Sequence, residues 1–547
     1  MKFLLLVSLA AVASSVIEGA PLDEEFGYVD VRPGAHMFWV MYHVDQEDDY
    51  TNYPLIMWLQ GGPGSSGVGF GNFEEMGPKD LNGNNRKYAW TKSANLMFVD
   101  NPVGTGYSYV DSSKDFAIDN MQIAADLVAL VKEVFTKNPD MQKMPFFVFA
   151  ESYGGKMTVD FALALDEAIK NGEVVSDFRG VALGDSWISP MDSINTWGTY
   201  LYQMGWVNRE GLNKVDAAAA KTQTAVDEER WTDATNEWSA SEGVVSSVAH
   251  DVNLYNVLAT EDIYLMKPQH SHRRHDLSFM SPAVRKLYER HVGRLHQKLG
   301  DSLYDFMNGA QKEHWLIPDS VEWDGQGGNV FDQLSEDFMK PVVDSVVRLL
   351  AETDLMVNVY TGDLDLICDT PGTYRWIENM EWEDKVNFMA ADTKAIHITE
   401  YSSPAALLQS SKKFALYTIF RTGHMVPMDV PEMGLKLVDL IVGTPTHTPE
   451  APKQETTKQE TPKQEAPKKE APKQEAPKEE APKKEAPNKE ASKKITPRKH
   501  VPVPLSAVDH NANRRRAQVV ATDLNPATPT GKRYVKMIPN NPGFRRG

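Results

Sequence analysis

A serine stands where a strand pattern gives way to a helix pattern, in the segment FFVFAESYGGK (residues 146–156). The apolar run ends at Phe149, and the small residues Ala150 and Gly154 lie two positions before and two after Ser152. Small residues at these positions let a tight turn close, which exposes the serine hydroxyl as a nucleophile. The usual first glycine of this turn is alanine here, so the segment alone also fits an ordinary strand-to-helix turn.

Two residues of the types that activate a serine follow later in the chain. Asp365 comes just after the apolar segment 357–360, and His424 follows a glycine in a loop after the segment FALYTIF. Taken singly, each also fits a surface turn. Their order, Ser152, then Asp365, then His424, is the chain order of α/β-hydrolase triads. We therefore predict that Ser152 is the nucleophile, His424 the base and Asp365 the residue that orients the imidazole.

Two glycines directly after another strand pattern, in PLIMWLQGGPGSSG (residues 54–67), are suited to stabilise an oxyanion. Glycine lets a backbone approach a ligand closely. We expect the backbone N–H groups of Gly62 and Tyr153 to donate hydrogen bonds to the developing negative oxygen. A phosphate-binding loop is the alternative, but the segment lacks the Lys-Ser/Thr ending of such loops.

The elements that must position these residues alternate between apolar runs and helical patterns. Alternation of this kind favours an α/β fold with a central, mostly parallel sheet covered on both faces. A helix is expected at 118–136. Buried strands are expected at 54–59, 96–99, 146–149, 180–183, 357–360 and 394–398.

Residues 192–337 interrupt this rhythm, because they are polar, rich in Ala, Glu and Lys, and mostly helical in pattern, as in 210–229. We interpret them as an inserted helical cap, after which a helix near 338–352 resumes the sheet pattern. The α/β-hydrolase core is then predicted in two parts, 21–191 and 338–443.

The N-terminus has the pattern of a secretory signal peptide. Lys2 precedes a short apolar run and then small residues, which predicts a leader over residues 1–20. The run is too short to span a membrane, and no later segment is long enough. We expect a secreted or lysosomal protein.

The C-terminal part differs in composition from the rest. Residues 444–500 hold five-residue repeats such as EAPKQ, and 501–547 are rich in arginine and lysine. Such segments cannot bury enough apolar area to fold, so we expect a linker followed by a basic disordered tail. Residues 449–547 carry a net charge of +10 and residues 1–448 one of −29. The tail is either a solubilising segment or one that binds an acidic surface or polymer.

Composition excludes several other classes of protein. The net charge of −19 disfavours a nucleic-acid binder. The single cysteine, Cys368, excludes an intramolecular disulfide and a cysteine-based zinc site. The histidines at 270, 272 and 275 are flanked by Arg273 and Arg274, which repel a cation. We therefore expect no metal and no cofactor.

Six segments together resemble the motifs of serine carboxypeptidases, with the greatest similarity to the retinoid-inducible subgroup, over residues 25–443. They are WLQGGPGSSG, FEEMGP, DNPVGTGYSY, ESYGGK, GDLDLIC and GHMVPMDVP. The resemblance implies an α/β-hydrolase fold and removal of single residues from peptide or protein C-termini, best at acid pH. It implies the same triad and oxyanion donors as above. It also implies that the substrate is bound by Trp58, Gln60, Gly61, Glu75, Glu151 and Met425.

A pairing of Glu75 with Glu151 would explain why the expected activity is best at acid pH. A protonated carboxyl can donate a hydrogen bond to the substrate's terminal carboxylate, whereas an ionised one repels it. Two carboxyls held close together share a proton, which raises the pKa of one. Binding of a free C-terminus should therefore weaken as the pH rises.

Three features depart from the pattern of the family. Gln60 stands where many members have Asn, and GDSWISP (residues 184–190) replaces a more common Asn-Gly form. A disulfide often present between the glycine loop and the loop of the catalytic Asp is absent, with Ser65 and Cys368 at its two positions.

Two alternatives stay open: an acyltransferase or esterase on the same scaffold, and a secreted binding protein that works through its tail.

Overall fold

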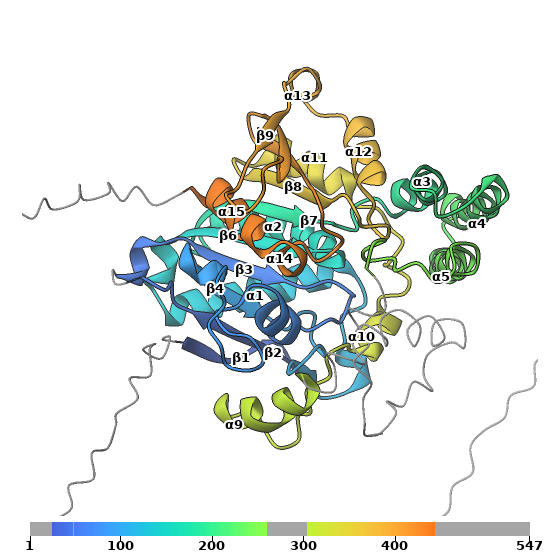
Figure 1. Ribbon diagram of the computed structural model, residues 1–547. Helices are drawn as coiled ribbons and strands as arrows, with labels where there is room; N and C mark the ends of the chain where they lie inside the picture. Colours follow the sequence, from blue (N-terminus) through green and yellow to red (C-terminus); the bar gives the residue numbers. More distant parts are fainter. Residues whose placement is uncertain (1–23, 47–48, 260–302, 444–547) are drawn as a thin grey trace, which may run out of the picture. The chain divides into compact units, whose positions relative to one another are not determined.

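The computed structural model describes residues 24–46, 49–259 and 303–443 (Figure 1). Several predictions fall outside these ranges: the signal peptide at 1–20, the histidines at 270, 272 and 275, and the linker and tail from residue 444 onward. Within the described ranges, no helix is both long enough and apolar enough to cross a membrane.

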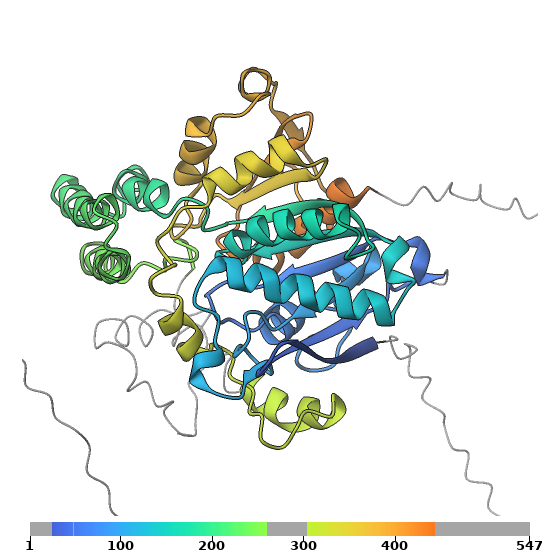
Figure 2. The ribbon, with the colours of Figure 1, turned by 180° about the vertical axis from the view of Figure 1, so that it is seen from behind.

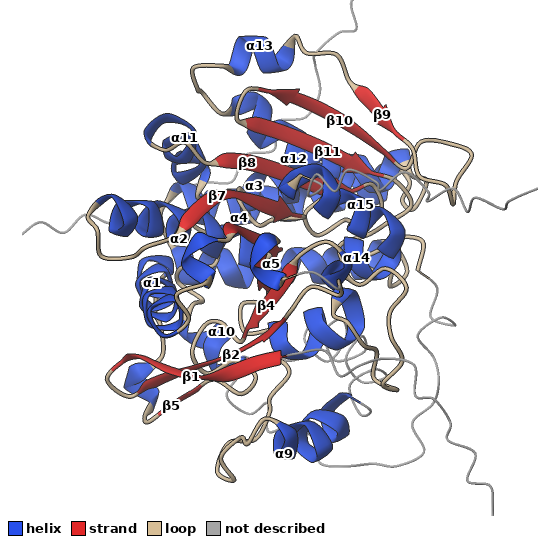
Figure 3. Cartoon of the chain, turned by 90° about the vertical axis from the view of Figure 1, so that its left-hand side faces the viewer, coloured by secondary structure: helices blue, strands red, loops and turns tan. Residues whose placement is uncertain are grey.

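A single mixed sheet forms the centre of the molecule, with the strand order β1-β2-β4-β3-β6-β7-β8-β11-β10-β9 and β5 paired with β2. Figure 3 shows the twisted sheet, with β10, β11, β8 and β7 toward one side and β4, β2 and β1 toward the other. The six strands from β4 to β11 pair in parallel, and the strands at both edges pair antiparallel. The strands are β1 (Glu24–Arg32), β2 (Ala35–Tyr42), β3 (Leu55–Leu59), β4 (Asn95–Val99), β5 (Tyr109–Val110), β6 (Pro145–Glu151), β7 (Asp177–Gly184), β8 (Met356–Gly362), β9 (Lys394–Ile396), β10 (Ala406–Ser411) and β11 (Phe414–Ile419).

Two apolar layers lie on the two faces of this sheet, because successive residues of a strand point to opposite sides. Met57 belongs to one layer, and its neighbours Ile56 and Trp58 belong to the other. The first layer packs under α1 (Asn120–Lys137), α2 (Tyr153–Lys170) and α11 (Val343–Glu352), which cross the sheet in Figure 2. The second packs under the π-helical segment η2 (Gly67–Met76) and α15 (Pro431–Val442). The expected α/β architecture is confirmed.

Three long helices follow β7 and form a group of their own at the side of the sheet (Figure 1). They are α3 (Pro190–Gln203), α4 (Arg209–Asp227) and α5 (Trp231–Val248). The remaining short helices are α9 (Lys312–His314), α10 (Gly328–Gln333), α12 (Thr370–Asn379), α13 (Lys385–Met389) and α14 (Val426–Asp429), with helical turns at Tyr50–Asn52, Trp90–Lys92, Ser113–Asp115, Met141–Lys143 and Met307–Gln311.

Helix ends differ from the expected ranges for local reasons. Helix α1 begins at Asn120 because Asp119 caps it, its side chain accepting a hydrogen bond from the Gln122 N–H. The helix expected near 338–352 begins only at Val343. Pro341 stands before this start, and a residue that precedes a proline avoids the helical conformation.

Candidate active site

Ser152 lies in the sharp turn between β6 and α2, in a conformation that non-glycine residues seldom adopt. Its φ is 61° and its ψ is −129°. Three backbone hydrogen bonds hold this turn: the Ser152 N–H donates to Gly184 O at 3.0 Å, and the Ser152 carbonyl accepts from Gly155 and Trp187. A strained backbone persists only where its surroundings enforce it, and such positions cluster at active sites.

Glycines let the loop after β3 and the start of α2 approach each other closely. A Cβ on Gly154 would lie 2.2 Å from the carbonyl oxygen of Leu59. A Cβ on Gly61 would lie 2.5 Å from the Cβ of Ser152. Any side chain at either position would force these segments apart, so the sequence keeps the two loops in contact by omitting it.

Asp365 and His424 are joined although they lie 59 residues apart. His424 Nδ1 hydrogen-bonds to Asp365 Oδ2 at 2.8 Å, and both side chains are buried. Asp365 also accepts the N–H groups of Ile367 and Cys368, at 2.9 and 3.2 Å. The His424 N–H donates to the Tyr255 carbonyl at 2.7 Å, which fixes the loop that carries the imidazole. Burial lowers the pKa of His424, which favours the neutral ring that a general base requires.

The third expected contact of the triad is open. No hydrogen bond joins the Ser152 hydroxyl to His424 among the described residues. Hydrogen bonds between a nucleophile and its base are often long in a free enzyme and shorten when substrate binds. The structure thus pairs Asp365 with His424, and Ser152 lies in the turn at the end of β6.

One expected oxyanion donor lies in the first turn of a helix, where backbone N–H groups have no partner within the helix, and the other lies in the loop after β3. Tyr153 is the first residue of α2, and Gly62 follows β3 with a φ of +109°. The Tyr153 side chain is engaged elsewhere, because its hydroxyl donates to Asp337 Oδ2 at 2.9 Å. Lys156 Nζ lies 2.8 Å from the same oxygen in a buried ion pair. Only the backbone N–H of Tyr153, and not its side chain, is therefore available to donate to an oxyanion.

The predicted substrate-binding side chains form one buried hydrogen-bonded chain. Trp58 Nε1 donates to Gln60 Oε1 at 2.7 Å. Gln60 Nε2 donates to Glu75 Oε1 at 3.0 Å and to Glu151 Oε1 at 3.1 Å. Glu75 comes from η2 and Glu151 from the end of β6, so Gln60 bridges two elements beside Ser152.

The two glutamates contact each other as well. Their side chains lie near enough to shift each other's pKa as hydrogen-bonding partners, and Oε2 of each is buried without a hydrogen-bond partner. Burial raises the pKa of Glu75 to about 7. Burial, followed by the charge of Glu75, raises the pKa of Glu151 well above its ordinary value. A shared proton satisfies both free oxygens, and this pair is protonated at acid pH. Met425, next to His424 in the sequence, occupies the N-cap position of α14.

Ser65 and Cys368, at the two positions of the absent disulfide, have separate partners. Ser65 hydrogen-bonds to Gln326, not to the loop of Cys368. Cys368 instead lies beside the triad, with its sulfur, an oxygen of Asp365 and a nitrogen of His424 all within 4.8 Å of one another. Burial raises the pKa of the thiol well above its ordinary range. A neutral thiol is a poor metal ligand, so the expectation of no metal stays in place here.

Three supporting residues were missed by the sequence reasoning. Tyr255 packs edge-on against His424 with ring centroids 5.2 Å apart. Asp429 accepts the Gly423 N–H at 2.7 Å and so holds the histidine loop. Asp185 follows β7 directly and is fully buried beside Asp365. The signal for Asp185 was the one used for Asp365, an acidic residue at the carboxyl end of a buried strand.

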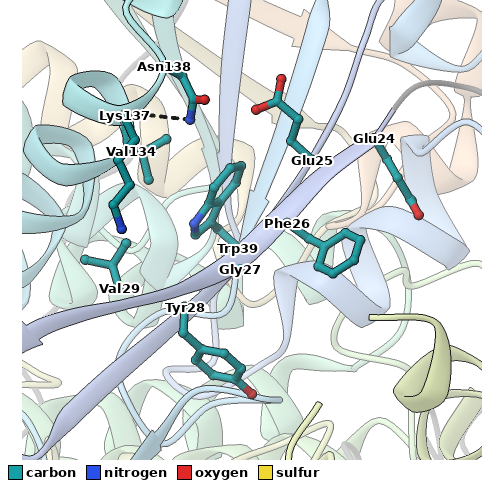
Figure 4. A pocket seen from close by; sticks show the side chains of 10 residues that line it. All are labelled: Glu24, Glu25, Phe26, Gly27, Tyr28, Val29, Trp39, Val134, Lys137 and Asn138. Carbon is teal, nitrogen blue, oxygen red and sulfur yellow. Dashed lines mark hydrogen bonds between the residues drawn. The ribbon is translucent and has the colours of Figure 1, made fainter. Parts of the chain in front are cut away.

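A pocket at the opposite edge of the sheet contains none of these residues. It is lined by β1, by Trp39 and by the end of α1, as Figure 4 shows. The site that the sequence predicted lies instead at the carboxyl ends of β3, β6, β8 and β11.

Comparisons with known proteins show the family to which the chain belongs. The model of the serine carboxypeptidase family matches residues 16–443. The retinoid-inducible serine carboxypeptidase of Rattus norvegicus is 42% identical over 421 residues, which cover 76% of this chain and 91% of that protein. Serine carboxypeptidase-like 51 of Arabidopsis thaliana is 36% identical over 433 residues, covering 77% and 93%. The crystal structure of a prohormone-processing carboxypeptidase from Saccharomyces cerevisiae superposes with a TM-score of 0.62 at 19% identity, covering 77% of this chain and 91% of that one.

Proposed function

Because the chain belongs to the serine carboxypeptidase family and is a serine-type peptidase, we propose that it removes single residues from peptide C-termini at acid pH. The observation that carries this proposal is the buried chain from Trp58 through Gln60 to the paired glutamates, which ends beside Ser152. A site of this kind can bind a terminal carboxylate next to a nucleophile, and that placement limits cleavage to the last peptide bond.

The reaction starts with attack by the Ser152 hydroxyl on the carbonyl carbon of that bond. His424 Nε2 takes the hydroxyl proton, and Asp365 stabilises the imidazolium through Nδ1. The N–H groups of Gly62 and Tyr153 donate to the negative oxygen of the tetrahedral intermediate. His424 then gives its proton to the nitrogen of the departing residue, and an ester remains on Ser152. Water then attacks that ester. His424 takes a proton from the water and gives one to the Ser152 oxygen as the ester bond breaks, which releases the shortened peptide.

Binding of the terminal carboxylate depends on protons held by Glu75 and Glu151. Below a pH of about 7 the pair retains a proton and can donate a hydrogen bond to the substrate. As the pH rises and the pair loses its protons, the site repels a second carboxylate. Acid pH thus favours substrate binding even though His424 works as a base.

The predicted leader and tail indicate where the proposed peptidase acts. A signal peptide at 1–20 directs the protein to the secretory route, outside the cell or to lysosomes. The net positive charge of residues 449–547 suits attachment to an acidic surface or polymer. Deletion of 449–547 should then reduce retention on an anionic matrix without changing hydrolysis, and equal retention would refute the attachment.

The direct test of the triad is hydrolysis of a blocked dipeptide by Ser152→Ala and Asp365→Asn. We expect Ser152→Ala to lower kcat by about 10⁶-fold and Asp365→Asn to lower it by about 10⁴-fold, because the histidine loses the partner that fixes its tautomer. Both variants should keep the circular dichroism spectrum of the parent. Substantial turnover by a folded Ser152→Ala variant would refute the serine mechanism. Full activity toward esters with none toward peptides would favour the esterase alternative.

A further inference from the structure

Asp185 occupies the end of β7, between the strand of the nucleophile and the strand of the catalytic aspartate. Strand β7 pairs with β6 on one side and with β8 on the other. Asp185 is 0% exposed and has a φ of 38°. Asp and Asn tolerate this left-handed conformation better than most residues. The turn therefore places a buried carboxyl where the loops of the active site meet.

One carboxyl oxygen of Asp185 has no hydrogen-bond donor. Oδ1 accepts the Gly362 N–H at 2.8 Å, and the Asp185 N–H donates to the Tyr360 carbonyl at 2.8 Å. Oδ2 is buried and has no protein donor. The carboxyl of Asp185 lies near enough to Asp365 to lower the pKa of Asp365 as a hydrogen-bonding partner. Two carboxyl groups hydrogen-bond to each other only when one of them holds a proton.

The surroundings decide which carboxyl holds that proton. Asp365 accepts three N–H donors, from Ile367, Cys368 and His424. Asp185 accepts one backbone N–H, from Gly362, and the Thr361 hydroxyl is its other neighbouring donor. Donors stabilise the ionised form, so the charge belongs on Asp365 and the proton on Asp185. A proton on Asp185 Oδ2 also gives that buried oxygen a partner. Burial raises the pKa of both carboxyls, but the charge of Asp365 raises the pKa of Asp185 further, whereas the Asp185 side chain lowers the pKa of Asp365.

We propose that Asp185 is a positioning residue whose neutral carboxyl donates a hydrogen bond to the ionised Asp365 and so fixes the orientation in which Asp365 holds His424. This inference rests on the triad proposed above. A neutral donor supports the negative carboxylate without adding a second charge beside the imidazole. An ionised Asp185 would instead place two negative groups in contact in a buried site, which is unfavourable.

Other titratable groups face Asp185 from the elements around it. Burial keeps the tyrosine and the thiol among them neutral by raising the pKa of each. His424 is therefore the group that reports on the charge of Asp185, since a negative Asp185 would raise the pKa of His424. The groups are Glu151 at the end of β6, Tyr360 in β8, Asp365 and Cys368 after β8, and His424 after β11.

The test measures how fast an uncharged fluorophosphonate labels Ser152 between about pH 4 and pH 8. This probe has no terminal carboxylate, so its rate reports the triad and not the Glu75–Glu151 pair. The labelling rate rises with pH as His424 loses its proton, and the midpoint of the rise gives the pKa of His424. The variants are Asp185→Asn, which keeps a donor of the same shape, and Asp185→Ala, which removes it.

For Asp185→Asn we expect a labelling rate within about threefold of the parent and an unchanged midpoint, because a neutral donor replaces a neutral donor. Asp185→Ala should label about 10- to 100-fold more slowly, the cost of a lost hydrogen bond to a charged group. A midpoint lowered by about one pH unit in Asp185→Asn would mean that Asp185 carries the charge, and would overturn the inference. So would a tenfold loss in Asp185→Asn or the parent rate in Asp185→Ala.

The two proposals fail differently in this experiment. Absence of labelling in the parent protein would refute the proposed triad. If the parent is labelled normally and the midpoint of Asp185→Asn is lowered by about one pH unit, only the role of Asp185 is refuted. If Asp185→Ala does not fold, Asp185→Asn alone still decides, because Asn tolerates the local backbone.

Discussion

At the scale of single residues, protons held by buried carboxyl groups control this site. Gln60 can donate to Glu75 and Glu151 at any pH, but the glutamates can donate to a substrate only while they are protonated. The same logic applies to Asp185 and Asp365. In the proposed mechanism, nucleophilic attack and substrate binding thus depend on different carboxyl pairs, and each pair can be altered separately.

Replacement of both glutamates, Glu75→Gln with Glu151→Gln, should separate the two dependences. In the parent protein, kcat/KM for a peptide with a free C-terminus should fall about tenfold per pH unit above the pKa of about 7. Amide side chains do not titrate, so the double variant should lose this fall. The measurement is kcat/KM against pH for a free and an amidated peptide, with the amidated peptide as the internal control. An equally steep fall in the double variant would contradict the role assigned to the pair.

At the scale of elements, the site depends on how closely α2 approaches the loop after β3. Gly154 lies in the first turn of α2, where a Cβ would meet the Leu59 carbonyl at 2.2 Å. Gly243 lies inside α5, where a Cβ would meet no heavy atom within 4 Å. The two glycines share a helical setting and differ in the space around them, so they form a matched pair.

Gly154→Ala should therefore lower both stability and activity, because α2 must shift and carries Ser152 and the Tyr153 N–H with it. A small displacement of reacting groups can cost about 100-fold in rate. Gly243→Ala should instead stabilise the protein by about 1 kcal/mol, the difference in helix propensity. Denaturant unfolding and kcat/KM measure both effects. Wild-type kinetics in Gly154→Ala would show that the close approach is not needed.

The sequence predicted the central elements better than the edges. Strands β3, β4, β6, β7 and β8 were recognisable because buried parallel strands read as continuous apolar runs. The β1–β2 hairpin was missed because β1 alternates polar and apolar residues at the sheet edge. The pairing of Asp185 with Asp365 joins residues 180 positions apart, and only the fold brings two such loops together.

At the scale of the whole molecule, the folded body holds more protons than its unfolded chain. Burial raises the pKa of several carboxyls, to about 8 for Glu74 and about 7 for Glu75 and Asp100, and upward for Glu151, Asp185 and Glu242. In the unfolded chain the same groups titrate near their ordinary values. Where the native state binds more protons, the free energy of unfolding falls as the pH rises.

The protein should therefore be most stable at acid pH, with stability lost between the ordinary pKa near 4.5 and the raised values. We expect Tm at pH 5 to exceed Tm at pH 8 by at least about 5 °C. Scanning calorimetry measures the difference. It should persist in about 0.5 M salt, which screens surface charges but not buried ones. An equal or higher Tm at pH 8 would contradict the protonated state assigned to these carboxyls.

Mass analysis of a peptide library incubated at pH 5 and at pH 7.5 tests the central claim most directly. The parent protein should shorten free peptides one residue at a time from the C-terminus, faster at pH 5, and leave amidated peptides nearly intact. Ser152→Ala should leave both unchanged. Internal cleavage by the parent protein, or stepwise shortening by Ser152→Ala, would contradict a serine carboxypeptidase built on these residues.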